Sequence, residues 1–388
     1  MMRHSSVRAA ALLAASALLV AACSSGNKTG AATTTAGGAT TTAGATSTVA
    51  GSTTTAAATT APSSSAPSGA WAVNTGDCVD AAAADKAISG TLRLGSVMPL
   101  SGGLAAAAFA PVKAGLQAYV DYANKQKMLG DVKIDLSVQD DQYNKDKTPG
   151  AVSKLIDGKV DVVTGIIGTP DNLAVRQVLN DSCIPQLNAL TGSPHWGEVK
   201  DFPWTTGILV PYDTESKVYA LQLSKMFPKG AKVALFYINT EFGTAYADAF
   251  KALAKQYNLD IVATETIEGE DATPPKSQVT NIAAKKPDVI MAVPLGAGCV
   301  TFLNALGAAK AQNKGWNPAT FITNTCASNL ILGAAGPDAN GLYTSGNTVD
   351  IGNAANAGLP EVKKYLDIMK AAGHADIATT AAAGWAVG

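Results

Sequence analysis

The sequence predicts an α/β protein built as two doubly wound parallel-sheet lobes, joined by a hinge and separated by a cleft. From Thr91 onward, short β-branched or apolar runs alternate with amphipathic helical patterns, which is typical of βαβ units and a mainly parallel sheet. The alternation occurs twice in the same order, on either side of an extended segment at 202–211. The chain after residue 90 is long enough for two domains of ordinary size. We therefore expect 91–209 and 347–388 to form the first lobe and 212–346 the second.

Short apolar runs in each half are predicted as strands. In the first half they are Leu92–Met98, Val132–Val138, Val160–Ile166 and Ile184–Ala189. In the second half they are Lys232–Ile238, Asp260–Thr266, Asp288–Pro294 and Thr320–Asn324. Apolar residues at helical spacing predict helices between them, as in Val112, Leu116, Tyr119 and Ala123, or Tyr246, Phe250, Leu253 and Tyr257. We interpret these apolar stripes as core.

The N-terminus has the pattern of an exported protein. Arg3 and Arg8 precede an uncharged run, Ala9–Ala22, that is too short to span a bilayer and reads as a signal peptide over 1–22. The residues before Cys23 resemble a bacterial lipobox, so Cys23 is the predicted lipidation site; an ordinary signal with a chance cysteine is the alternative. Acyl chains would hold the protein at the outer face of the bacterial cytoplasmic membrane.

The segment 23–75 is predicted to be a disordered linker after the lipidated cysteine. It is almost entirely Ala, Thr, Ser and Gly, and it carries a single charge at Lys28 before residue 68. Such a composition buries too little apolar surface to offset its conformational entropy. We expect a flexible tether between the membrane and the folded part.

Charge and histidine usage exclude several functions. The chain has 29 Lys+Arg and 30 Asp+Glu, which gives no reason to expect nucleic acid as a partner. Arg93 and Arg176 are the only arginines after the signal, so arginine clusters for phosphate are not expected either. None of the cysteines has the close spacing of a zinc site, and His4, His195 and His374 are isolated from them, so we predict no metal and no cofactor.

Apart from Cys23, the cysteines form an even set in an oxidising compartment, where pairing is the default. The preferred pairs are Cys78–Cys183 and Cys299–Cys326. Cys78 and Cys183 both lie shortly before strands of the first lobe. Cys299 follows the third predicted strand of the second lobe and Cys326 ends the fourth, and these strands are neighbours in a 2-1-3-4-5 order.

Ligands of open α/β sheets bind outside the carboxyl ends of the strands. In this sequence that rule selects loops rich in Gly, Ser, Thr and Asn, at Pro99–Ala106, Ile167–Asp171, Leu190–Ser193, Asn239–Phe242, Leu295–Gly298 and Thr325–Ser328. We expect a small molecule to bind there, between the lobes.

From about Thr91 to Gly388 the chain resembles the Leu/Ile/Val-binding family of type I periplasmic binding proteins. The segments that carry the resemblance are Leu94–Gly102, Val160–Gly165, Glu241–Gly243 with Ala247–Phe250, and Pro287–Ile290. The resemblance implies a substrate-binding protein that delivers its ligand to the permease of an ABC importer, acts as a monomer and has no enzymatic activity.

The resemblance also implies a set of ligand-binding residues. In the family, first-lobe hydroxyls and main-chain N–H groups hold the ligand's carboxylate, near the positive end of a helix. The matching positions are Ser101, Gly102, Gly168, Thr169, Ala189, Leu190 and Thr191, with Phe242, Leu295 and Thr325 from the second lobe. The alternative interpretation is that Thr169 and Thr191 are only helix N-caps.

Departures from the family pattern bear on the ligand. The family's acidic residue for an ammonium group is missing from Thr323–Ser328. Two aromatic walls are replaced, by Ala107 and Leu295, while Phe242 keeps the third. Because an unpaired buried ammonium is costly, these changes favour an apolar carboxylate, an amide or another uncharged small molecule, within the wider class of amino-acid-like ligands.

Two other functions were weighed. A lipid-anchored sensor of the same fold would bind its ligand in the same way. A secreted α/β hydrolase would need a nucleophile elbow, and no G-x-S-x-G occurs in the sequence. In the family, the segment resembling Ala381–Val387 is followed by a further crossing into the second lobe, so we expect the natural chain to continue past Gly388.

Overall fold

A computed structural model describes residues 75–85, 87–269 and 273–388 of the chain. The predicted signal peptide, Cys23 and the predicted linker up to residue 74 lie outside these residues. Within the described part, no helix is long and apolar enough to cross a membrane.

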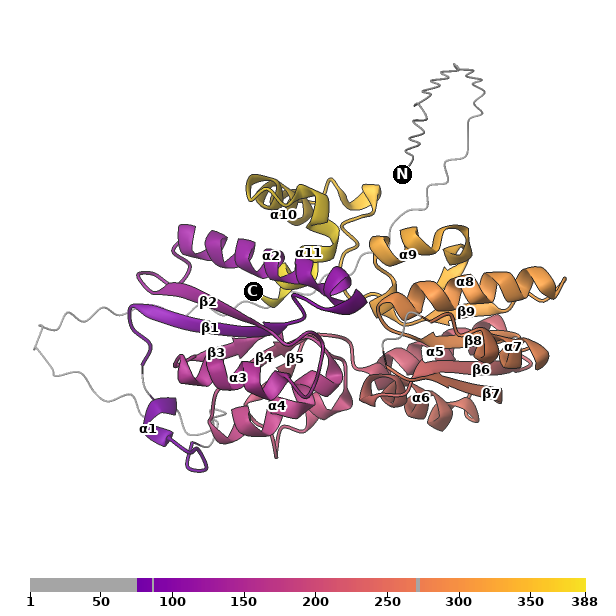
Figure 1. The fold of residues 1–388 in the computed structure, drawn as a ribbon, viewed down its shortest axis with the longest axis horizontal. Coiled ribbons are helices and arrows are strands. Elements are labelled where there is room, and N and C mark those ends of the chain that lie inside the picture. Colours follow the sequence, from indigo (N-terminus) through magenta and orange to yellow (C-terminus); the bar gives the residue numbers. More distant parts are fainter. Residues whose placement is uncertain (1–74, 86, 270–272) are drawn as a thin grey trace, which may run out of the picture. The chain divides into compact units, whose positions relative to one another are not determined.

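Two five-stranded parallel sheets form the two lobes (Figure 1). The first has the order β2-β1-β3-β4-β5 and the second the order β10-β9-β8-β6-β7, so both follow the predicted 2-1-3-4-5 pattern. The first sheet contains β1 Thr91–Met98, β2 Lys133–Asp140, β3 Val162–Thr164, β4 Gln186–Ala189 and β5 Thr205–Gly207. The second contains β6 Ala231–Ile238, β7 Leu259–Ile267, β8 Val289–Val293, β9 Ala319–Ile322 and β10 Leu342–Tyr343.

All the predicted strands are present, and the α/β fold class is confirmed. Two short edge strands were not predicted. β5 lies inside the segment interpreted as a plain crossing between lobes, and it pairs with β4. β10 pairs with β9 through two residues. Strands this short have no alternating pattern to detect, because their formation depends on the neighbouring strand. The exact lobe boundaries remain a prediction.

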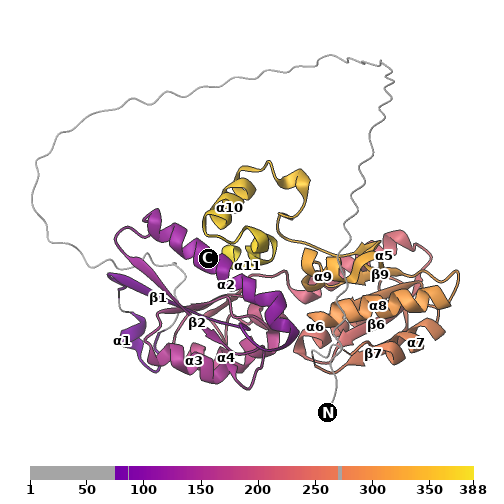
Figure 2. The same ribbon diagram turned by 45° about the horizontal axis from the view of Figure 1, so that its top comes forward.

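Helices cover both faces of each sheet (Figures 1 and 2). The α-helices of the described residues are α1 Ala81–Ala84, α2 Gly103–Lys125, α3 Thr148–Asp157, α4 Thr169–Asp181, α5 Tyr212–Met226, α6 Glu241–Ala254, α7 Lys276–Ala284, α8 Ala297–Gln312, α9 Asn329–Ala335, α10 Pro360–Ala371 and α11 Ala378–Val387. On the first sheet, α2 and α11 pack on one face and α3 and α4 on the other.

Successive side chains of a strand point to opposite faces of the sheet, so each strand contributes to two hydrophobic cores. In β6, Val233, Leu235 and Tyr237 pack with α5 and α6, whereas Ala234 and Phe236 pack with α7 and α8. Because both faces are buried, these strands read as continuous apolar runs in the sequence.

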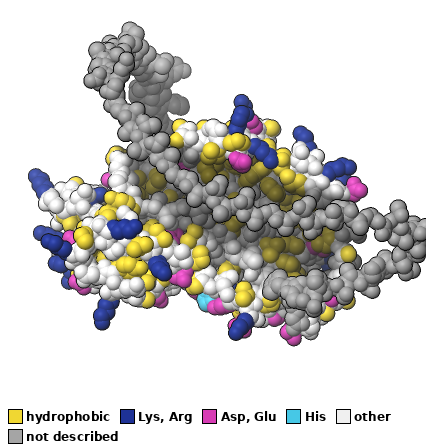
Figure 3. Space-filling model, turned by 180° about the vertical axis from the view of Figure 1, so that it is seen from behind, with side chains coloured by type: hydrophobic (Ala, Val, Ile, Leu, Met, Phe, Trp, Pro, Cys, Tyr) yellow, Lys and Arg dark blue, Asp and Glu magenta, His cyan; other side chains and the backbone are white. Residues whose placement is uncertain are grey.

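On the face of the molecule shown in Figure 3, basic and acidic side chains are scattered among uncharged ones.

The Cys78–Cys183 pair of the sequence analysis is a disulfide in the structure, with 5.5 Å between the two Cα atoms. Cys183 lies between α4 and β4, at the amino end of that strand. The bridge therefore joins the described N-terminal segment to the edge of the first lobe that is remote from the carboxyl ends of its strands.

α2 and α11 touch along their backbones. A Cβ atom added to Gly384 would lie 1.8 Å from the carbonyl oxygen of Val112, and one added to Gly115 would lie 1.9 Å from that of Ala381. Only glycine permits this approach, so the two helices pack closer than side chains would allow. Val387 then reaches the core beneath α2, together with Met98.

Gly384→Ala should therefore destabilise the protein by about 1–3 kcal/mol, because the new methyl group has no space. In an ordinary helix the same exchange stabilises by about 0.5–1 kcal/mol. Gly150→Ala in α3 is the matched control, since an added Cβ there meets open space. In urea unfolding, the midpoint concentration should fall for Gly384→Ala and rise for Gly150→Ala. A rise for both variants would contradict the close packing of α2 and α11.

Candidate ligand-binding site

The predicted donors of the first lobe come together at the carboxyl ends of β3 and β4. A parallel bridge between Ile167 and Leu190 continues the pairing past both strands. It places Thr169, the first residue of α4, beside Thr191. Their Oγ1 atoms lie 2.8 Å apart, and both residues are only 1% exposed. Ala189 and Leu190 directly precede Thr191, and the N–H of Gly168 donates to the carbonyl oxygen of Leu190 at 3.4 Å, so these residues form one cluster.

Neither threonine is a helix N-cap, and this alternative interpretation was wrong. Gly168, at φ 102°, is the N-cap of α4, and no side chain caps that helix end. Thr191 Oγ1 instead accepts a hydrogen bond of 3.1 Å from the backbone N–H of Ser193. The two hydroxyl groups are therefore not consumed by capping α4, whose first turn provides a positive helix end.

Ser101 and Gly102 differ from the buried threonine pair in their exposure and partners. Both are exposed, at the turn between β1 and α2. Ser101 donates its hydroxyl hydrogen to Asp140 at the end of β2, and Asp140 Oδ1 also accepts the Leu100 N–H at 2.9 Å. The side chain of Ala107, in α2, is outside the described part of the structure. A ligand contact of Ser101 or Gly102 remains a prediction.

Aromatic side chains form the second-lobe side of the site. Phe242, Leu295 and Tyr246 belong to one buried cluster, which also includes Tyr212. Phe109 and Tyr143, from segments of the first half of the chain, pack against this cluster. Ala107 and Leu295 replace two aromatic walls of the family pattern, but the fold supplies aromatic rings from other elements: Phe109, Tyr143, Tyr212 and Tyr246.

A buried carboxylate lies next to the end of β9. Glu215, in α5, is 0% exposed, and its Oε1 accepts the backbone N–H of Asn324 at 3.2 Å. Tyr219 donates its hydroxyl hydrogen to the same carboxylate, and Tyr246 donates to Oε2 at 2.6 Å. The segment Thr323–Ser328 contains no carboxylate of its own, and the fold brings Glu215 to it from α5.

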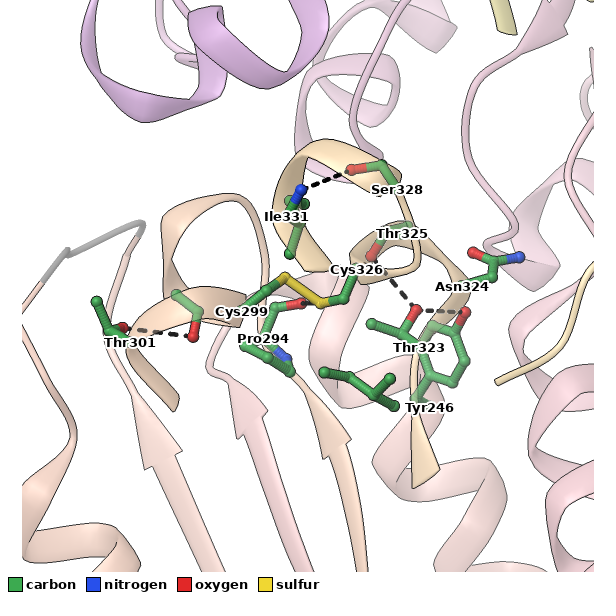
Figure 4. The surroundings of a disulfide bond; sticks show 12 residues. Tyr246, Pro294, Cys299, Thr301, Thr323, Asn324, Thr325, Cys326, Ser328 and Ile331 are labelled. Atoms are coloured by element: carbon green, nitrogen blue, oxygen red, sulfur yellow. Dashed lines mark hydrogen bonds between the residues drawn. A yellow bond between two sulfur atoms is a disulfide. The ribbon is translucent and has the colours of Figure 1, made fainter. Parts of the chain in front are cut away.

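The second predicted disulfide, Cys299–Cys326, is also present, with a Cα–Cα distance of 5.7 Å. It ties the start of α8 to the 3-10 helix Asn324–Cys326 that follows β9 (Figure 4). Thr323 donates to the Tyr246 hydroxyl at 3.1 Å, and Thr325 lies 3.4 Å from Thr323. Thr325 therefore joins the hydroxyl and carboxylate network of the second lobe.

Sequence reasoning missed Tyr212 and Glu215, although a signal was present. The two residues are three apart, and Tyr219 follows four residues after Glu215, so all three share one helix face. An acidic residue on the buried face of a helix, between two tyrosines, indicates a hydrogen-bonded carboxylate.

A pair of buried carboxyl groups, Asp141 and Asp171, was also missed; Asp171 lies in the first turn of α4. Thr148 Oγ1 is 3.0 Å from Asp141 Oδ2 and 3.1 Å from Asp171 Oδ1. One hydroxyl group donates one hydrogen, so it cannot serve two carboxylates at once. Burial raises the pKa of Asp171 to about 7, and the adjacent Asp141 adds to the rise; burial also raises the pKa of Asp141. The pair therefore retains a proton well above the usual range of carboxyl groups.

Asp171→Asn should stabilise the protein at pH 8 more than at pH 5. The folded chain holds a proton up to about pH 7 that the unfolded chain releases near the ordinary pKa of 3.8. Wild-type stability from this group thus falls as pH rises through that window, and the neutral amide avoids the loss. The gain in unfolding free energy of Asp171→Asn over wild type should therefore be roughly 1–3 kcal/mol larger at pH 8 than at pH 5.

Denaturant unfolding of both proteins at pH 5 and pH 8 measures this difference. Asp157→Asn, an exposed residue of the neighbouring helix α3, is the control and should show no such pH dependence. A stability difference for Asp171→Asn that does not change with pH would show that the pair carries no extra proton.

The fold and the cluster of buried donors at the carboxyl ends of the strands are those of a two-lobed solute-binding protein. The family model described as periplasmic binding protein matches residues 91–387, and the chain belongs to this family. No curated protein sequence is significantly similar to it.

Solved structures share the fold. A possible leucine/isoleucine/valine-binding protein from Rhodopirellula baltica SH 1 is 19% identical, with a TM-score of 0.66 over 76% of this chain and 79% of that chain. A branched-chain amino acid ABC transporter protein from Thermus thermophilus, with bound valine, is 18% identical, with a TM-score of 0.66 over 76% and 75%. A solute-binding protein from R. palustris in complex with benzoate is 21% identical, with a TM-score of 0.64 over 76% and 78%.

Proposed function

We propose that this protein is the extracytoplasmic solute-binding lipoprotein of an ABC importer, and that it captures a small amino-acid-like, amide or apolar carboxylate ligand by closure of its two lobes. The observation that carries the proposal is the buried pair of threonine hydroxyls, Thr169 and Thr191, at the start of α4. Donors in that position suit the polar end of a small molecule.

The apolar body of the ligand would lie against Phe242 and Leu295. Both are buried in the cluster that also contains Tyr212, whose hydroxyl is 3.4 Å from Thr169 Oγ1. The polar pair and the apolar cluster are thus adjacent, as a site for a molecule with one polar end requires. The two structural relatives with bound valine and bound benzoate are compatible with such a ligand.

Glu215 widens the ligand class that the sequence alone favoured. Its carboxylate lies beside Asn324, where an ammonium counter-charge was thought to be missing. All its described partners are neutral donors, two tyrosine hydroxyls and one backbone N–H. A ligand with an amino group would therefore meet a negative charge in the second lobe, which keeps amino-acid-like molecules in the proposal.

Attachment to the membrane rests on the lipobox-like residues before Cys23. Mass spectrometry of the N-terminal peptide, purified from a bacterial host, should show a diacylated Cys23, and Cys23→Ser should release the protein from the membrane fraction. An unmodified N-terminus would remove the lipoprotein part of the proposal and leave the binding function open.

A thermal-shift screen of the mature protein against amino acids, amides, ureas and small carboxylates tests the binding function. A ligand at 100 times its Kd should stabilise the protein by about 2.7 kcal/mol. Absence of any shift across these classes would contradict the proposed function.

With a ligand in hand, Thr169→Ala and Thr191→Ala should each weaken binding by about 1–3 kcal/mol, because a buried polar group of the ligand loses its partner. Calorimetry measures the change. Thr280→Ala, an exposed threonine of α7, is the control and should bind as the wild type does. Unchanged affinity in both site variants would move the polar end of the ligand elsewhere.

Thr325→Asp should shift preference toward ligands with an amino group, since it adds a negative charge to the segment after β9. Titration of wild type and variant with leucine and with its deaminated analogue, 4-methylpentanoate, measures the preference. Tight wild-type binding of leucine with weak binding of the analogue would show that an ammonium clamp already exists, and Glu215→Gln would then identify whether Glu215 provides it.

A further inference from the structure

We infer that Tyr212 is a ligand-contacting residue that adds a third hydroxyl donor to the Thr169–Thr191 pair, and that this group of three makes the site select carboxylates over the matching amides. The inference rests on the proposed function and assigns the chemistry of the ligand's polar end. Tyr212 belongs to α5, in the second half of the chain, whereas Thr169 begins α4 and Thr191 follows β4, both in the first half.

The backbone holds Tyr212 firmly against the threonine segment. Its N–H donates to the carbonyl oxygen of Gly192 at 2.7 Å. A Cβ atom added to Gly192 would lie 2.6 Å from the Tyr212 ring, so the ring lies directly on that glycine. The residue after Thr191 must therefore be small for the tyrosine to reach the pair.

Stacking fixes the ring from its other side. The Tyr212 and Tyr246 ring centroids are 4.4 Å apart with an interplanar angle of 24°, and Phe242 meets Tyr212 edge-on at 5.2 Å. Tyr246 in turn donates to Glu215. The position of Tyr212 thus depends on the second-lobe network, and a ligand that contacts it bonds to both halves of the protein at its polar end.

The hydroxyl of Tyr212 is close to the threonine pair but not tightly bonded to it. It lies 3.4 Å from each Oγ1 atom, longer than the roughly 2.5–3.0 Å of a good O–H···O bond. Burial raises the pKa of Tyr212, so the hydroxyl keeps its hydrogen and remains a donor. If the Tyr212 hydroxyl turned toward a ligand oxygen, it would therefore lose only these two long hydrogen bonds.

Counting hydrogens points to an acceptor as the missing partner. Tyr212, Thr169 and Thr191 each bring one O–H, and Thr191 already accepts from Ser193 N–H. For Tyr212 and Thr191, the described acceptors of these hydrogens are only the other oxygens of the trio. A carboxylate has two acceptor oxygens and no donor, so it can receive all three hydrogens. An amide ligand would turn its NH₂ group toward one of the three hydroxyl groups, and the charge-assisted hydrogen bond at that position would be lost.

Matched acid and amide pairs test this inference: 4-methylpentanoate with 4-methylpentanamide, and benzoate with benzamide. Calorimetry on the full-length mature protein should show each acid that binds to be about 10- to 100-fold tighter than its amide, the range for one hydrogen bond to a charged group. Tyr212→Phe should weaken the acid by a similar factor and change the amide less than about threefold.

Tyr257→Phe is the matched control. Tyr257 is half-buried against the same second-lobe cluster, and the exchange removes the same hydroxyl group at a different place. The melting temperature and circular dichroism of Tyr212→Phe should match the wild type, since the two hydrogen bonds that it loses are long.

The outcomes separate the inference from the proposed function. Equal affinity of wild type and Tyr212→Phe for the acids, or amides that bind as tightly as acids, would overturn the inference. So would binding of an amide with no acid bound at all, a result that leaves the proposed function intact. Leucine also carries a carboxylate, so if it binds it is compared with leucinamide by the same criterion. If no ligand of any class binds the wild type, the proposed function itself fails.

Discussion

The turn between β3 and α4 is the constraint on which the site depends. Asn172 donates to the carbonyl oxygens of Ile166 at 2.8 Å and Gly168 at 2.7 Å, and Gln186 donates to the Asn172 side chain at 2.8 Å. One buried amide thus ties the end of β3, the first turn of α4 and the start of β4 together. With these three held, Thr169 and Thr191 meet at a fixed distance where α4 begins.

In the second lobe, packing must satisfy a carboxyl group, Glu215, that is 0% exposed. Glu215 is surrounded by described donors rather than by a cation, and each donor belongs to a separate element: Tyr219 to α5, Tyr246 to α6 and Asn324 to the segment after β9. Tyr219 also bonds to Ser345, in the segment that leads away from β10. The carboxylate therefore organises the part of the second lobe that faces the site, and the Cys299–Cys326 bridge restrains the same segment. Burial of a carboxyl group costs free energy unless its oxygens are hydrogen-bonded, so these donors must lie at defined positions around Glu215.

The two halves of the site have complementary chemistry. The first sheet contributes small hydroxyl side chains at a helix start, and the second lobe contributes large rings with a charge behind them. Tyr212 has both properties, a ring in the aromatic cluster and a hydroxyl beside the threonines. A molecule with an acceptor at one end and an apolar body is the kind of ligand that such a division suits.

Much of this protein follows from local sequence pattern. Apolar runs and helical spacing predicted the two parallel sheets, because continuous apolar strands and amphipathic helices report burial on a sheet's two faces. The 2-1-3-4-5 order was expected for the second lobe from its doubly wound class, and both sheets have it. The carboxyl-end rule selected the loops that hold Thr169, Thr191, Phe242 and Leu295.

Only the tertiary structure decided which residues from distant parts of the chain lie next to one another, because no local sequence pattern links them. β5 and β10 exist only because a neighbouring strand offers hydrogen bonds. Asp141 and Asp171 share Thr148 across three elements, and Glu215 supplies a charge beside Asn324 from 109 positions away in the chain. Periodicity tells which side of a helix is buried, but it does not tell what lies opposite. The partner of a buried polar group is set by packing between distant elements, and for Tyr212 and Glu215 that packing decides the chemistry of the site.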